Sequence, residues 1–323
     1  MDTIKISITL KRIGVKMLAK TKLLIIGFLI IGYSVFNYSQ IIEPSQKWIK
    51  VIDNLNFPEG PTYDGVSSIY FSNCYGGWIA KYNNGAVDTF LIKNDERINI
   101  NKTNGLAYGS DGYLYICEYG YGQILRVDKD KNIAVYANGY NGEKFNRPND
   151  IVIDANGNIF FTDPKSYDKN ILDGRIFFID AKTKQIKLIA DSLAFPNGIK
   201  ISPADGKLYV CESAKQKIVS FNISDDGALT GKSDFVFLPG GDPDGIEFDK
   251  EGNLYVAHYG GGAVYIFSKE GKLIQKIPTP GLKPTNLEFG GPDLKTLFLT
   301  EVQTNSLYKI EVKNSGSKLI KNN

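Results

Sequence analysis

From residue 40 onward, the chain repeats one pattern of polar and apolar positions six times. Each copy opens with turn-forming residues, continues as an alternating apolar and polar run, turns at a cluster such as DANGN, and ends in a run rich in β-branched and aromatic residues. Alternation with period two is typical of strands, so each copy predicts a β-hairpin. The copies are FPEGPTYDGVSSIYFSN, KTNGLAYGSDGYLYICE, RPNDIVIDANGNIFFTD, FPNGIKISPADGKLYVCE, DPDGIEFDKEGNLYVAH and KPTNLEFGGPDLKTLFLTE.

The third residue of each copy measures the length of the repeat. These residues follow one another at intervals of 45, 45, 48, 47 and 41 positions and are Glu59, Asn104, Asn149, Asn197, Asp244 and Thr285. Such a period holds about four short strands, and further strand-like runs, such as Lys217 to Ile223, follow the hairpins without a long amphipathic helix. We therefore expect an all-β, six-bladed β-propeller with four-stranded antiparallel blades around a central channel. The earlier run Lys47 to Leu55 is expected to supply an outer strand to the last blade and so close the ring.

The first 39 residues differ from the rest in charge and hydropathy. They hold six basic residues against one acid, whereas the remaining 284 residues hold 32 basic and 34 acidic residues, a net charge of −2. The apolar run Leu23 to Phe36 has 14 residues, fewer than the roughly 20 that a bilayer span needs. Residues 1–39 are therefore interpreted as a signal peptide, which predicts an exported protein, periplasmic or secreted; an uncleaved membrane anchor is the alternative. The body gives no reason to expect a nucleic-acid or membrane surface.

Histidine and cysteine usage narrows the chemistry. The chain has a single histidine, His258, which excludes multi-histidine zinc sites and HExxH helices, and it has no GxSxG motif. Its three cysteines, Cys74, Cys117 and Cys211, form no CxxC pair and are interpreted as buried, small apolar residues. Chemistry based on oxygen ligands remains open.

Two columns of polar residues mark the two ends of the predicted hairpins. The first is the set of third residues given above, and the second, 14 to 16 positions later, is Asn73, Glu118, Asp163, Glu212, His258 and Glu301. Because the start of one hairpin strand lies beside the end of the other, both columns are expected at one mouth of the channel. Carboxylate and amide oxygens from separate blades suit a hard divalent cation, calcium in the first place, with magnesium or manganese next and zinc less so.

Other interpretations of these residues stay open. A single PNG or PDG is more often a turn than a ligand, although Glu59 is not a favoured turn residue. For Glu212 and Glu301 solvated strand ends are expected, and for Asp163 an Asp-Pro turn acceptor. His258 is interpreted either as a hydrogen-bonded wall residue or as a surface residue.

The motifs resemble one known family in order and register. EGPTYD, RPNDIVID with FFTDP, FPNGIKISPADGKLYV, PDGIEFDKEGNLYVAHYGGGAVYIF and KPTNLEFGGPDLKTLFLT resemble the family of senescence marker protein, gluconolactonase and luciferin-regenerating enzyme, which includes regucalcin, and most of all its bacterial gluconolactonases. The resemblance runs from about Phe57 to Val312. It implies a six-bladed propeller lactonase domain, here residues 40–323, with one divalent metal in the channel. The ligands that it implies are Glu59, Asn149, Asn197 and Asp244.

The resemblance also implies an activity and further site residues. It suggests a metal-dependent hydrolase that opens sugar lactones such as glucono-1,5-lactone, a small-molecule substrate, to the aldonic acid. Asp244 is implied as the base that activates water, or only as a metal anchor, and the substrate-binding residues are Asn104, Glu118, Arg147, Asn149 and His258. Tyr119 departs from the family, which has His after the CE pair. The alternatives are another hydrolase on the same cage, such as a phosphotriesterase, and a non-catalytic calcium-binding propeller.

Overall fold

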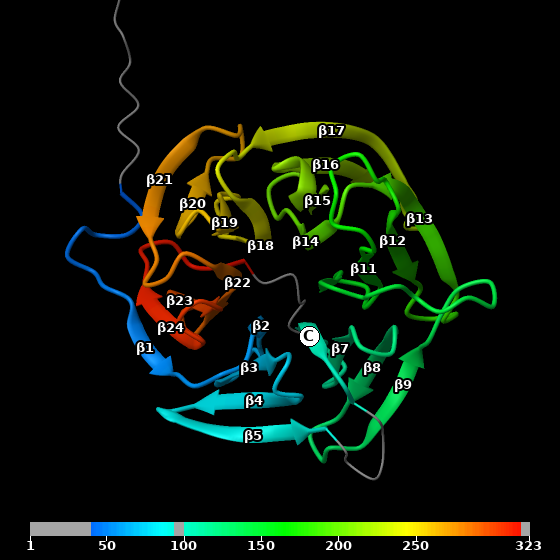
Figure 1. Cartoon of the computed structure of the whole chain (residues 1–323), viewed down its shortest axis with the longest axis horizontal. Helices are drawn as coiled ribbons and strands as arrows, with labels where there is room; N and C mark the ends of the chain where they lie inside the picture. Colours follow the sequence, from blue (N-terminus) through cyan, green and yellow to red (C-terminus); the bar gives the residue numbers. More distant parts are fainter. Residues whose placement is uncertain (1–39, 94–99, 318–323) are drawn as a thin grey trace, which may run out of the picture. The chain divides into compact units, whose positions relative to one another are not determined.

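The computed structural model describes residues 40–93 and 100–317, which belong to one compact unit, Ser39–Asn323. It confirms six antiparallel sheets of four strands each, arranged as blades around a centre (Figure 1). The predicted signal peptide lies outside the described residues. Within the described ranges, no helix is both long and apolar enough to cross a bilayer.

Each blade consists of four strands, numbered outward from the channel except where the ring closes. Blade 1 is β2 (Pro58–Tyr63), β3 (Ser68–Asn73), β4 (Trp78–Asn83) and β5 (Ala86–Ile92). Blade 2 is β6 (Thr103–Tyr108), β7 (Leu114–Glu118), β8 (Gln123–Val127) and β9 (Ile133–Ala137). Blade 3 is β10 (Ile151–Ile153), β11 (Ile159–Asp163), β12 (Gly174–Ile179) and β13 (Ile186–Leu193).

The other three blades follow the same order. Blade 4 is β14 (Pro196–Ile201), β15 (Leu208–Glu212), β16 (Lys217–Ile223) and β17 (Leu229–Phe237), with a short 3-10 turn, η1 (Ser213–Lys215), after β15. Blade 5 is β18 (Asp242–Phe248), β19 (Leu254–Tyr259), β20 (Ala263–Phe267) and β21 (Leu273–Pro278). Blade 6 is β22 (Pro284–Gly290), β23 (Thr296–Glu301), β24 (Ser306–Glu311) and β1 (Ile49–Ile52).

The ring is closed by the two ends of the propeller. Strand β1 pairs antiparallel with β24, and Ile49 stands opposite Lys309 in this pair. The N-terminal strand therefore completes the blade that the C-terminal strands begin (Figure 1). This confirms the strand expected within Lys47 to Leu55. The pairing also joins the first and last blades, since opening the ring would expose the edge of β24.

The hairpin turns form where the Gly, Asp and Asn clusters predicted them. In DANGN the carboxylate of Asp154 accepts the backbone N–H groups of Asn156 and Asn158, each at 2.8 Å. Gly157 has φ of +82°, a conformation that costs glycine little and other residues more. The turn is therefore stabilised locally, before any contact between blades.

Large apolar side chains fill the spaces between neighbouring blades. Phe160 and Phe178 of blade 3 pack in one buried cluster with Ile199 and Val210 of blade 4, and similar clusters join other neighbours. The two phenylalanines are about 1% exposed. Truncation of such a buried ring to alanine costs about 3–5 kcal/mol, so the packing between blades holds the channel residues in place. The three cysteines are free and buried, as predicted.

Candidate functional site

The six third residues of the repeats, here called the channel residues, stand at or next to the start of the innermost strands. In five blades the pairing of the two inner strands shifts register at this point, for instance between Glu59 and Thr62 and between Pro243 and Ile246. Such a β-bulge inserts an extra residue and turns a side chain out of the regular alternation. The bulges therefore accompany the predicted site positions in all blades but the third.

Hydrogen bonds between blades hold the backbone of the channel residues. A hydroxyl at the inner end of one blade donates to the carbonyl of a channel residue, or of the residue before it, in the next blade. The pairs are Ser72 to Asn104 at 2.7 Å, Thr162 to Asn197 at 2.8 Å, Ser213 to Pro243 at 2.6 Å and Thr285 to Pro58 at 2.9 Å. Neighbouring blades are thus bonded to one another directly at the site.

Glycine after a channel residue lets the inner strands approach closely. A Cβ on Gly60 would lie 2.3 Å from the carbonyl oxygen of Asn104, and one on Gly198 would lie 2.2 Å from that of Asp244. Gly60 also has φ of +41°. These glycines are consequently required by packing around the channel, in addition to any role in a turn.

The carboxyl groups of the site lie close enough to perturb one another. Burial raises the pKa of Glu59 to about 8, and the charge of Asp150 adds to the effect. Burial also raises the pKa of Asp244 well above its usual range, with Glu59 next among the causes, while a hydrogen bond from Asn197 opposes the shift. Glu59 is 5% exposed and Asp244 7% exposed. The structure thus brings these two predicted residues into one buried electrostatic group.

Asp150 belongs to this group and was missed by the sequence reasoning. It is 3% exposed, accepts the backbone N–H of Ile151 at 2.9 Å and that of Ile199 at 3.3 Å, and is bonded by the side chain of Asn286 from blade 6. Burial raises its pKa, and the charge of Lys200 opposes the shift. A signal was present, because Asp150 and Asn286 stand where the other four copies have glycine.

The donor set suits a hard divalent cation. Burial of two mutually repelling carboxylates is unfavourable unless a positive charge or protons compensate them. Glu59 and Asp244, with the amide oxygens of Asn149 and Asn197, are oxygen donors of the kind that calcium prefers. No group of three or more His, Cys, Asp or Glu residues in the described ranges has the arrangement of a metal centre. The predicted set of two carboxylates and two amides differs from such a group, since half of its donors are amide oxygens.

The second column holds the segments that lead into the inner strands. Five of its six side chains accept backbone N–H groups located two or three residues before the channel residue of the same blade. The bonds are Asn73 from Asn56, Glu118 from Asn101 and Lys102, Asp163 from Asn146 and Arg147, Glu212 from Ala194, and Glu301 from Lys283, at 2.6 to 3.1 Å. These residues therefore position the backbone next to the site.

This geometry corrects three expectations. Glu212 and Glu301 were expected as solvated strand ends, but both are 0% exposed because their carboxylates are bonded to the chain. Asp163 was expected to cap an Asp-Pro turn; instead it accepts N–H groups from the preceding loop and forms a 2.6 Å ion pair with Arg175. Each carboxylate is hydrogen-bonded by protein donors in place of water, and this explains why it can be buried.

Glu118 and His258 are also bonded to the backbone, Glu118 to N–H groups and His258 to a carbonyl. Glu118 is 0% exposed and also accepts the N–H of Tyr121 at 2.6 Å. His258 is 1% exposed, which rules out the surface interpretation, and its Nε2 lies 3.1 Å from the carbonyl oxygen of Leu238. Burial lowers its pKa. Contact of either residue with a substrate stays a prediction.

Tyrosines surround the channel above Glu59. Burial, followed by the charges of neighbours that include Tyr119, Glu59 and Tyr259, raises the pKa of Tyr75, so Tyr75 of blade 1 lies near groups of blades 2 and 5. Tyr167, from the loop after β11, donates to the carboxylate of Asp242 at 2.5 Å. This end of the channel, here called the opening, thus presents tyrosine rings together with their hydroxyl groups.

Two further predicted residues lie beside this group. The guanidinium of the exposed Arg147 stands 5.6 Å from the centre of the Tyr119 ring. Asn104 is 6% exposed and follows the strand start of blade 2. The structure therefore places Arg147 at the opening and Asn104 further in, among the channel residues.

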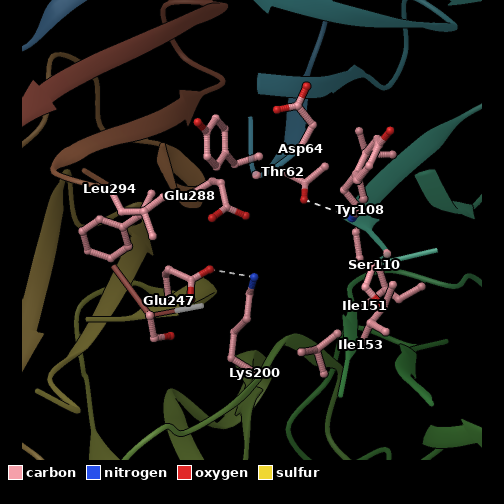
Figure 2. Close-up of a pocket in the computed structure, with 18 of the residues that line it drawn as sticks. Thr62, Asp64, Tyr108, Ser110, Ile151, Ile153, Lys200, Glu247, Glu288 and Leu294 are labelled. Carbon is pink, nitrogen blue, oxygen red and sulfur yellow. Dashed lines mark hydrogen bonds and ion pairs between the residues drawn. The ribbon is translucent and has the colours of Figure 1, made fainter. Parts of the chain in front are cut away.

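A cavity of about 530 Å³ lies toward the other ends of the inner strands. It is lined mostly by residues that follow the channel residues by two or more positions, among them Thr62, Tyr108 and Ile151. Figure 2 shows the Lys200 ammonium directed at the carboxylate of Glu247, 2.7 Å away, with Glu288 facing the same space. None of the predicted site residues lines this cavity, so it is separate from the group around Glu59.

Comparison with known proteins identifies the family. The family model described as "SMP-30/Gluconolactonase/LRE-like region" matches residues 57–303, well over half of the chain. The chain belongs to this family. The resemblance inferred from the EGP, PND, PNG and PDG motifs is thereby confirmed.

Several members of the SMP-30/gluconolactonase family are similar over most of the chain. A gluconolactonase of Zymomonas mobilis is 30% identical over 233 residues, 66% of this chain and 64% of that protein, slightly less than two thirds of its length. A diisopropyl-fluorophosphatase of Loligo vulgaris is 30% identical over 307 residues, 86% of this chain and 95% of that protein. The solved structure of a Xanthomonas campestris gluconolactonase has a TM-score of 0.72 at 26% identity, covering 84% of this chain and 90% of that one.

Proposed function

We propose that the protein is a metal-dependent hydrolase that opens sugar lactones, such as glucono-1,5-lactone, to the aldonic acid. The observation that carries the proposal is the buried group formed by Glu59 and Asp244, in which burial and then the charge of Glu59 raise the pKa of Asp244 beside the amide of Asn197. Such a group needs a cation or protons to compensate its charges, and strongly perturbed carboxyls in a channel are typical of functional sites. The gluconolactonases of Zymomonas mobilis and Xanthomonas campestris support the choice of substrate.

Glu59, Asn149, Asn197 and Asp244 would hold the ion, for which calcium is the first choice. When bound, a divalent cation supplies Lewis-acid polarisation of the lactone carbonyl. The carboxyls of Glu59 and Asp244 must lose their protons to act as ligands, and their raised pKa values make that loss depend on pH.

The remaining steps fall to the side chains. Asp244 either accepts, at its carboxylate, the proton of the attacking water or serves only as an anchor, and both roles require the unprotonated group. Asn197 hydrogen-bonds the Asp244 carboxylate and holds its orientation. Arg147, exposed at the opening, and Asn149 would orient the sugar hydroxyls. The hydrogen bonds between blades hold these positions, so little reorganisation is needed during the reaction.

The experiment compares wild-type protein with Asp244→Asn in glucono-1,5-lactone hydrolysis, followed by proton release, and in calcium binding, followed by calorimetry. We expect turnover to be abolished under either role of Asp244. Retained calcium binding identifies Asp244 as the proton acceptor, and lost binding identifies it as the anchor. Asp191→Asn, at an exposed position of the outer strand β13, is the matched control and keeps full turnover. Normal turnover by Asp244→Asn would remove this residue from the chemistry.

One relative favours a second candidate activity. The similarity to the diisopropyl-fluorophosphatase covers 95% of that protein, and a hard cation polarises a P=O bond as it does a C=O bond. Assaying diisopropyl fluorophosphate and glucono-1,5-lactone in parallel on the same preparation separates the two activities. Chelation that changes neither hydrolysis nor thermal stability would favour a non-catalytic propeller instead.

A further inference from the structure

The residues two positions before the channel residues form a second set of six positions around the channel, here called the second level of the site. They are Phe57, Lys102, Arg147, Phe195, Asp242 and Lys283. Two residues of chain span at most about 7 Å, so each of these lies near its channel residue, at the opening that the tyrosines surround. Three of the six are cations, on blades 2, 3 and 6, and one is an acid, on blade 5.

The backbone of all three cationic residues is held by a buried carboxylate. Glu118 accepts the N–H of Lys102 at 2.9 Å, Asp163 that of Arg147 at 2.7 Å, and Glu301 that of Lys283 at 2.8 Å. The three carboxylates are 0% exposed. Charge-assisted hydrogen bonds of this kind are strong, so they fix the backbone from which the three cationic side chains extend.

The cationic groups themselves lie over aromatic rings. Lys102 lies over the ring of Tyr75 at 5.0 Å, Arg147 over Tyr119 at 5.6 Å, and Lys283 over Tyr259 at 5.6 Å. Within residues 40–93 and 100–317, none of the three cationic side chains takes part in an ion pair or a side-chain hydrogen bond. Among the described residues, their charges therefore have no direct ion-pair partner.

The cations border the opening on three blades. Of the three tyrosines over which they lie, Tyr75 is close enough to Tyr119, Tyr259 and Glu59 for their charges to raise its pKa, after the larger effect of burial. The acid of this level, Asp242, is bonded to Tyr167. In the ring, blades 2 and 3 are neighbours and blade 6 stands opposite blade 3, and the acid stands on blade 5.

We propose that Lys102, Arg147 and Lys283 bind a negatively charged substituent of the substrate, so that the lactone is an acidic sugar lactone carrying a phosphate or carboxylate group. This rests on the proposed lactonase function. A neutral sugar offers hydroxyls, which need no cationic partner. A phosphate or carboxylate pairs with several cationic donors at once and would orient the ring relative to the channel residues.

The test compares glucono-1,5-lactone with its 6-phosphate and with glucaro-1,5-lactone, which carries a carboxylate at the same carbon. We expect kcat/KM at low salt to be at least about tenfold higher for one of the acidic lactones than for the neutral one, and the ratio to fall as salt screens the charges. The better of the two acidic lactones identifies the anion as phosphate or carboxylate.

Variants locate the effect. Lys102→Gln and Lys283→Gln should each lower the acidic-to-neutral ratio about fivefold, as expected when one unit charge acts across several ångströms of wet channel. The matched control is Lys276→Gln, since Lys276 lies over the Tyr265 ring at 5.0 Å but on β21, the outermost strand of blade 5. It should leave the ratio unchanged. Thermal unfolding of all variants checks that they fold.

Two results would overturn the inference while leaving the lactonase proposal intact: equal kcat/KM for neutral and acidic lactones, or a ratio insensitive to both lysine substitutions at the opening. If no lactone is hydrolysed, the lactonase proposal fails, and calorimetry with D-glucose 6-phosphate and D-glucose decides about the anion site. Tighter binding of the phosphate that weakens in Lys102→Gln supports the site, and equal binding of the two sugars refutes it.

Discussion

Lys200 lies inside the channel, where a single substitution has a calculable effect. Its side chain is 15% exposed, its ammonium group is 2.7 Å from the carboxylate of Glu247, and that side chain is 9% exposed. Burial raises the pKa of Glu288 to about 8, with Lys200 opposing the shift, so Glu288 is mostly protonated at neutral pH. Lys200→Met consequently leaves Glu247 as the main uncompensated charge of this group.

The size of the penalty depends on pH. A buried carboxylate that loses its partner escapes the full cost by taking up a proton, which at pH 7 costs about 1.4 kcal/mol for each of the roughly 2.7 units above an ordinary glutamate pKa. We therefore expect Lys200→Met to lower the free energy of unfolding by about 4 kcal/mol at pH 7, within the range for broken buried ion pairs. At pH 5 the loss shrinks to about 1 kcal/mol. In the variant, folded Glu247 holds a proton that the unfolded chain has released. The free energy of unfolding therefore falls as the pH rises above the ordinary glutamate pKa of about 4.3.

Guanidinium unfolding followed by tryptophan fluorescence, at pH 5 and 7 in the presence of a chelator, measures both values. Lys50→Met is the matched control, because the Lys50–Asp53 pair has side chains 49% and 48% exposed and its loss should not be measurable. Lys200→Met combined with Glu247→Gln should recover most of the stability at pH 7. A loss in Lys200→Met of less than about 1 kcal/mol at pH 7, or one equal at both pH values, would refute the reasoning.

Three further predictions concern the backbone and hydrogen bonds around the site. Gly60→Ala should lower the free energy of unfolding by about 2 kcal/mol more than Gly65→Ala, because both have positive φ but only the former brings a Cβ within 2.3 Å of the Asn104 carbonyl; equal losses in denaturant unfolding would contradict this. Glu118→Ala should cost about 3–5 kcal/mol, since it leaves three backbone N–H groups unpaired, whereas Glu118→Gln, which keeps one acceptor oxygen, should cost less; the same assay ranks them. His258 is buried with a lowered pKa, so the unfolded chain binds a proton that the folded chain refuses and stability falls as pH drops below about 6.5; His258→Gln should flatten that slope between pH 7 and 5, and an unchanged slope would show that other groups cause it.

The blade architecture could be predicted because it follows from local periodicity. Alternation, turn chemistry and a repeat of about 45 residues specify four-stranded units, and six such units close into a ring. Even the closing strand β1 was predictable, since it is a strand-like run left over before the first repeat. The burial of the cysteines followed from their positions inside apolar runs.

The first column of site residues was predictable for the same reason. A channel residue such as Asp244 occupies a set place in every repeat, so its position along a strand is known from the sequence. That Asp244 interacts with Glu59, far away in the chain, follows once the ring is closed. The ion and the reaction remain proposals.

Other features were decided only by the tertiary structure. Periodicity locates Glu118 and Glu301 at strand ends, but whether such a carboxylate meets water or a backbone N–H depends on the path of the loop beside it. Likewise Asp150 meets Asn286, and Lys200 meets Glu247, across different blades. A pattern along the chain specifies which face a side chain occupies, whereas its protonation and partners depend on atoms that only the closed ring brings together.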